Sequence, residues 1–316
     1  MSNRLLMIAL STAAAAAIAT MLPARVAGQA KTVSPPQKPA STAAARTPDG
    51  HPDLTGTYDL AMLTPLERPN GLPAVLSDEE AAKREKEAEQ KVLEGDAKIA
   101  GDRTAPPKGG DGSVGAAGNV GGYNTFWLDG GTKYPKINGE RRTSIVVDPP
   151  DGKVPALTPE ARQRNMSRLA QFRAPTSDAS ESLDPGLEPA GSYDDPERRP
   201  LGERCILGFG STSGPPALPN YFYNNLHQIV QTADHVMIQT EMVHDARIVR
   251  MNAEHLPPTI RNWMGDSVGR WDGDTLVVDT TNFTGKTRFR NSTENLHVVE
   301  RFSRLDKNTL LYRFTI

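Results

Sequence analysis

The sequence predicts a mainly β fold: an antiparallel meander or barrel-like sheet, with two peripheral helices and long irregular insertions. From Cys205 onward, apolar and polar residues alternate in successive short stretches, and no helical period comes between them. Only two stretches in the chain open with helix start signals. Tracts rich in Gly, Pro and Ser separate the periodic segments. Because a long meander leaves its faces and edges uncovered, it usually curls into a barrel.

The strongest hairpin signal lies in Met264–Phe283. Asp272-Gly273 is a two-residue loop of the kind that accepts positive φ, so the chain is expected to fold back there. The resulting register pairs Trp271 with Asp274. Beyond the turn, the alternation predicts that one face of the strand carries Leu276, Val278 and Thr280.

The remaining strands follow from the same alternation. They are expected at His51–Leu60, Thr143–Asp148, Lys153–Leu157, Gln228–Thr232, His235–Glu241, Asp245–Met251, Leu296–Arg304 and Thr309–Ile316. Because the final strand pattern reaches the last residue, we expect the natural protein to continue beyond a truncated C-terminus.

Two helices are predicted outside the sheet. Ser77 with Glu80 forms a capping box that opens a charged helix over Asp78–Leu93. Thr158-Pro159 is an N-cap followed by proline at the first helical position, and it opens a helix to about Phe172. The helices fall within two expected insertions, at about residues 77–122 and 158–203.

The N-terminus has the composition of a targeting segment. Arg4 precedes an apolar, Ala-rich run, and Gly28 and Ala30 supply the small residues of a cleavage site. We expect a signal peptide over residues 1–30, a flexible tether over 31–50, and a single β-rich domain over 51–316. The protein is therefore expected to be periplasmic or secreted.

Charge and cysteine content exclude several classes of function. The formal net charge is −2, with 36 basic and 38 acidic residues, so no basic surface for nucleic acid or anionic membranes is expected. The lone Cys205 excludes an intrachain disulfide and a multi-cysteine metal site. We expect no cofactor and no membrane association beyond the signal peptide.

Several segments together resemble a group of exported, largely uncharacterised bacterial proteins. They are DGHPDLTG (49–56), IVVDPPDGK (145–153), YNNLHQIVQT (223–232), EMVHDAR (241–247) and the 263–283 segment. The resemblance implies export and a β-rich fold, and it supplies no reaction. Leu54–Tyr58 also has a faint similarity to the opening strand of lipocalin-like barrels, with Tyr58 where that motif has Trp.

The densest polar cluster suggests acid–base chemistry. His244 with Glu241 or Asp266 could donate or abstract a proton, because a carboxylate fixes the tautomer of a neighbouring imidazole. A metal site is not predicted, since residues three apart on a strand point to opposite faces. The alternative is that these residues form ordinary structural ion pairs.

A second set of residues suits the binding of a small organic molecule. Aromatic walls with a few amides and arginines predict a ligand site that includes Trp263, Trp271, Tyr223, Asn225, Arg247 and Arg261. Each aromatic could equally fill the core. Two functions therefore stay open: binding of a hydrophobic or aromatic ligand inside a barrel, or an exported hydrolase, lyase or isomerase that uses His244.

Overall fold

The computed structural model describes residues 45–97, 128–173, 201–208, 214–219, 224–287 and 289–316. Contacts divide the chain into two units, Met1–Ser41 and Thr42–Ile316. The first unit, with the expected signal peptide, lies outside the described residues, as does most of the expected tether. The described residues all belong to the second unit.

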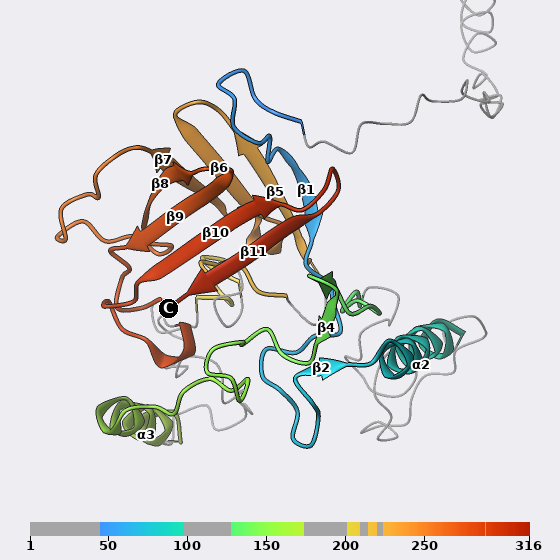
Figure 1. Cartoon of the computed structure of the whole chain (residues 1–316). Coiled ribbons are helices and arrows are strands. Elements are labelled where there is room, and N and C mark those ends of the chain that lie inside the picture. The colour runs from blue at the N-terminus through green and yellow to red at the C-terminus, as the bar shows by residue number, and fades with distance from the viewer. Residues whose placement is uncertain (1–44, 98–127, 174–200, 209–213, 220–223, 288) are drawn as a thin grey trace, which may run out of the picture. The chain divides into compact units, whose positions relative to one another are not determined.

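An eight-stranded, nearly closed barrel-like sheet dominates this unit, as the sequence predicted (Figure 1). The strand order is β1-β5-β6-β7-β8-β9-β10-β11. The strands are β1 (Gly56–Asp59), β5 (Leu226–Gln231), β6 (His235–Thr240), β7 (Ala246–Met251), β8 (Asp266–Asp272), β9 (Thr275–Thr281), β10 (Val298–Arg304) and β11 (Leu310–Thr315).

The sheet departs from the expected meander at one place, where β7 and β8 run parallel. The expectation of a purely antiparallel order is wrong here because residues 252–265 form a crossover that brings the chain back in the same direction. Gly265 ends this crossover at φ +73°, and a Cβ there would lie 2.5 Å from the carbonyl oxygen of Thr281. Only glycine fits this close approach.

The β8–β9 hairpin forms, but its turn is displaced by one residue. The loop is Gly273-Asp274, flanked by the pair Asp272 and Thr275, and Trp271 faces Leu276 instead of Asp274. Gly273 has φ +57° and Asp274 is not in the positive-φ region, which matches a turn with glycine at its first central position. The pairing shifts by two residues, so the predicted faces are preserved.

A second, three-stranded sheet has the order β2-β4-β3 and consists of β2 (Val75–Leu76), β3 (Lys136–Ile137) and β4 (Glu140–Arg142). Its tight turn is Asn138-Gly139, with positive φ at both residues. The strands that we predicted at Thr143–Asp148 and Lys153–Leu157, which would have paired as a hairpin, are wrong, because neither segment is a strand. The Asn-Gly signal just before these segments marks the actual turn.

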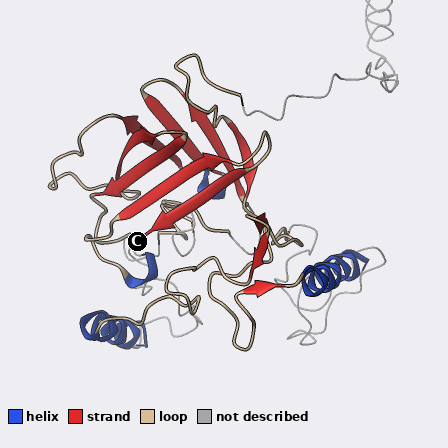
Figure 2. Cartoon of the chain, in the orientation of Figure 1, coloured by secondary structure: helices blue, strands red, loops and turns tan. Residues whose placement is uncertain are grey.

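Helices are few beside the strands (Figure 2). Helix α2 (Asp78–Ala97) and helix α3 (Pro159–Arg173) confirm the two predicted start signals. The Glu80 amide donates to Ser77 Oγ and the Ala161 amide donates to Thr158 Oγ1, so both expected N-caps form.

The interior of the barrel contains a main hydrophobic cluster. Its buried members are Leu54, Ile229, Val236, Ile238, Val249, Met251, Leu276, Val278 and Phe302. Residues 45–54 lie against one end of this cluster: Leu54 is fully buried, and the His51 ring stacks on Trp271 with centroids 4.5 Å apart. The DGHPDLTG segment therefore contacts the main cluster directly through Leu54 and, by way of Trp271, through His51.

A smaller hydrophobic cluster contains Phe283, Phe289, Leu296 and Val298, with Leu218 packed against it. Phe289 belongs to a short 3₁₀ turn, Phe289–Asn291. Val298 lies on the same face of β10 as Glu300 and Phe302, because strand side chains alternate. On the inward face of β10, Val298 therefore belongs to the smaller cluster and Phe302 to the main cluster, and Glu300 lies between them.

Candidate functional site

A layer of polar residues crosses the interior of the barrel between the two hydrophobic clusters. Each strand from β5 to β11 contributes one inward-facing member to it. These seven residues, called here the polar layer, are His227, Thr240, Arg247, Ser267, Thr280, Glu300 and Tyr312. All but Tyr312 are at most 6% exposed.

An ion pair between Arg247 and Glu300 forms the centre of the polar layer. Arg247 Nη1 donates to Glu300 Oε2 at 2.5 Å, and Nη2 donates to Oε1 at 2.9 Å. The Arg247 side chain is 7% exposed and that of Glu300 is fully buried. Such a two-point pair satisfies both charges without water.

Hydroxyl groups complete the hydrogen bonding around this pair. Tyr312 donates to Glu300 Oε1 at 2.8 Å and accepts from the Ala217 amide at 2.9 Å. Burial and the neighbouring carboxylate of Glu300 raise the pKa of Tyr312 well above its usual value, so the phenol stays neutral. The Ser267 and Thr280 hydroxyls lie 2.9 Å apart, and Arg247 Nη1 approaches both.

His227 differs from the rest of the polar layer because neither ring nitrogen has a hydrogen-bond partner among the described residues. Its side chain faces inward from β5, between Tyr58 on β1 and Thr240 on β6, and is 5% exposed. Burial, and then the positive charge of Arg247, lower the pKa of His227 from 6.5 to about 4. The imidazole is therefore neutral at neutral pH, with one donor and one acceptor unused.

The acid–base residues that we expected do not converge in the structure. His244 and Glu241 lie in the turn between β6 and β7, where His244 Nδ1 is 3.0 Å from the Glu241 carbonyl oxygen. The carboxylate of Glu241 accepts from the Leu226 amide instead. Asp266 begins β8 on its outward-facing side and has other partners.

Asp266 anchors the crossover between β7 and β8. Its carboxylate accepts from Arg250 Nη2 at 2.9 Å and from the Leu256 amide at 2.8 Å, and it lies 3.0 Å from His255 Nδ1. Burial alone would raise the pKa of Asp266, but these hydrogen bonds outweigh it and hold the pKa below its usual value. The other nitrogen of His255 faces Asp279, so the cluster is internally paired.

The expected ligand-binding residues also separate. Trp271 packs on the main hydrophobic cluster, Asn225 donates to the Asp129 carbonyl at 2.6 Å, and Arg261 donates to two backbone carbonyls. Lys286 lies over the ring of Trp263, with its ammonium nitrogen 5.9 Å from the centroid. Tyr223 lies outside the described residues. Arg247 alone, of this set, belongs to the polar layer.

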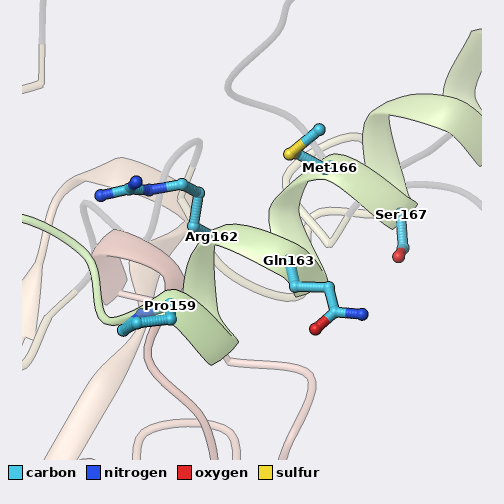
Figure 3. A pocket seen from close by; sticks show the side chains of 5 residues that line it. All are labelled: Pro159, Arg162, Gln163, Met166 and Ser167. Carbon is cyan, nitrogen blue, oxygen red and sulfur yellow. The ribbon is translucent and has the colours of Figure 1, made fainter.

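A hollow on the surface of helix α3 is lined by Pro159, Arg162, Gln163, Met166 and Ser167. Figure 3 shows Arg162 and Met166 pointing to one side of the helix and Gln163 and Ser167 to the other. All five residues are exposed, and they do not converge on one point. This hollow does not have the enclosed, convergent character of a ligand site.

Metal and membrane sites are not found in the described part of the chain. There, no three His, Cys, Asp or Glu side chains are arranged to hold a metal ion. Within the same residues, no helix combines the length and apolar character that a bilayer crossing requires.

Sequence reasoning missed most of the polar layer. A detectable signal existed, because each of these strands replaces one apolar residue of its inward face by a polar one. That signal could be recognised only once all the inward faces were known. Comparison of the chain with family models, curated proteins and solved structures finds no match, so the assignment of a function depends on this geometry.

Proposed function

We propose that the protein binds a small molecule inside the barrel, at the polar layer beside His227. The observation that carries this proposal is a buried imidazole whose two ring nitrogens have no hydrogen-bond partner among the described residues. Buried polar groups in native proteins almost always have partners, and an exception calls for an ordered water or ion, a bound molecule, or a functional role. His227 is such an exception.

The neighbouring residues give a contrast within the same layer. Arg247, Glu300 and Tyr312 are joined by three hydrogen bonds of 2.5 to 2.9 Å. They behave as a satisfied structural network, whereas leaving a donor or acceptor buried and unpaired costs about 1–3 kcal/mol. A ligand that fills both vacant positions of His227 would offset this cost.

The geometry also favours a different kind of ligand from the one that the sequence predicted. A hydrophobic or aromatic ligand was expected against apolar walls, but the main hydrophobic cluster is closed by its own side chains, all at most 9% exposed. The ligand is therefore proposed to be recognised through a polar group at His227. Any apolar or aromatic part of it lies outside the main cluster.

A thermal-shift screen tests this proposal. The complete chain is heated in the presence of a broad panel of small organic molecules, and hits are repeated with the His227→Phe variant. A ligand at 100 times its Kd should add about 2.7 kcal/mol to the free energy of unfolding. The shift should disappear in His227→Phe and persist in Arg261→Ala, a matched change of a predicted ligand residue that lies elsewhere. Hits that keep their full shift in His227→Phe would contradict the proposal.

An acid–base enzyme has weaker support. The expected group of His244, Glu241 and Asp266 is divided between a turn and the outer face of the sheet. Glu300, the carboxylate inside the barrel, already accepts three hydrogen bonds and is neutralised by Arg247. Among the described residues of the polar layer, His227 is then the remaining candidate base for a hydrolase, lyase or isomerase, and its pKa of about 4 makes it a weak one.

We also propose that the protein is exported, on the composition of residues 1–30. Expression in a Gram-negative host, followed by N-terminal sequencing of the product, tests this. Cleavage after Ala30 is the expected result. A product that keeps residues 1–30 and stays in the cytoplasm would contradict export.

A further inference from the structure

We infer that the molecule bound at the polar layer is electrically neutral and presents both a hydrogen-bond donor and an acceptor, as a hydroxyl or a primary carboxamide does. This inference rests on the proposed function and adds the chemical class of the ligand. It follows from the hydrogen bonding and charge of His227, Arg247, Glu300 and Tyr312.

The positive charge of the layer is already matched. Both terminal nitrogens of Arg247 bind Glu300, one to each carboxylate oxygen. An anion would have to displace Glu300, which is fully buried and has no other cation within the layer. Expelling a carboxylate from its partner in a dry interior leaves an uncompensated buried charge. Anionic ligands are therefore disfavoured.

A cationic ligand is disfavoured for the complementary reason. Glu300 Oε1 accepts from Tyr312 and Arg247 Nη2, and Oε2 accepts from Arg247 Nη1. Three of the roughly four acceptor positions of the carboxylate are therefore filled, and its charge is already balanced by Arg247. Arg247 lies close enough to His227 to lower the pKa of its imidazole, so it would also repel a positive group placed there.

This leaves the imidazole of His227 as the group that a ligand would contact. A neutral imidazole has one N–H donor and one acceptor nitrogen, on opposite sides of the ring. Both lack a partner among the described residues. A ligand that is only an acceptor, such as a ketone or an ether, would satisfy one of the two. A hydroxyl or carboxamide can serve either nitrogen, and with one bridging water it can satisfy both.

Four probes that share a benzene ring separate the charge classes: phenol, benzamide, benzoate and benzylammonium. The complete chain is labelled with ¹⁵N in its six histidines, and His227→Phe identifies the signals of His227 by their loss. We expect phenol and benzamide to shift the two His227 nitrogens in a saturable way. We expect benzoate and benzylammonium to bind at least ten-fold more weakly. The His227→Gln variant, whose amide keeps a donor and an acceptor, has no His227 signals, so its preference is measured by thermal shift with the same four probes, and it should be retained.

The outcomes distinguish the two proposals. If benzoate or benzylammonium shifts the His227 signals as strongly as benzamide, the ligand class inferred here is wrong while binding at the layer stands. If no probe shifts those signals, and the thermal-shift screen also gives no hit that depends on His227, both proposals fall and the imidazole is satisfied by water alone. If phenol and benzamide raise the melting temperature of His227→Phe as much as that of the wild-type chain, the role of the imidazole is refuted.

Discussion

Acid should destabilise this protein in a pH range where few carboxylates titrate, because His227 is buried and has no hydrogen-bond partner in the described part of the chain. In the folded chain its pKa is about 4, against 6.5 for an unperturbed histidine. Between these two values the unfolded chain holds a proton that the folded chain does not, so the free energy of unfolding falls as the pH falls. Above pH 6.5 the imidazole is neutral in both the folded and the unfolded chain, so His227 no longer lowers the free energy of unfolding.

The size of the effect follows from the same two values. Each pH unit in this interval costs about 1.4 kcal/mol, so lowering the pH from 6.5 to 4 removes about 3 kcal/mol of stability. A typical domain has about 5–15 kcal/mol in total, so the loss is large enough to measure. Carboxylates with lowered pKa, such as Asp266, lose their contribution only at lower pH, below about 4.

Urea unfolding at half-unit steps from pH 7.5 to 4.5, followed by tryptophan fluorescence, measures this dependence. The wild-type chain should lose stability steadily below pH 6.5. His227→Phe should remove most of that slope, and His227→Gln should do the same if the larger ring is not tolerated. The matched control is His235→Gln, a change of an exposed histidine in the same hairpin. A wild-type slope that survives in both His227 variants would refute the reasoning.

Three further predictions concern stability in urea. Glu300→Gln should cost about 3–5 kcal/mol because it leaves Arg247 buried without its counter-charge, and the double change Arg247→Met with Glu300→Leu should regain much of this. Asp266→Ala should cost about 1–3 kcal/mol and speed hydrogen exchange in residues 252–265, whereas Asp272→Ala should cost less than about 1 kcal/mol, since its ion pair is exposed. Gly265→Ala should destabilise by more than about 1 kcal/mol, because φ is positive and the added Cβ meets backbone.

Each of these has an outcome that would contradict it. A Glu300→Gln variant within about 1 kcal/mol of wild type would mean that water reaches Arg247. Unchanged exchange in residues 252–265 after Asp266→Ala would show that the crossover is held by other contacts. A neutral Gly265→Ala would mean that the β9 backbone can move away from the new methyl group.

Sequence alone was sufficient for the local features of the fold. The N-caps at Ser77 and Thr158 and the alternation along β5 to β11 depend on residues close together in the chain, so their pattern is visible without a structure. The residues that share each face of β9 were also predicted correctly, since a register shift of two residues leaves the faces unchanged. The turn itself was misplaced, because Asp-Gly and Gly-Asp both form two-residue hairpin loops.

Only the tertiary structure decided what depends on distant pairing. The parallel placement of β7 and β8 results from a crossover whose end at Gly265 is fixed by contact with Thr281 on another strand. The polar layer gathers one residue from each of seven strands, and no spacing along the chain encodes their meeting. His227 looked like one ordinary polar residue in a strand. It stands out because it is buried on the inward face and neither ring nitrogen bonds to a residue that the structure describes. That property depends on its neighbours in space, which the sequence does not give.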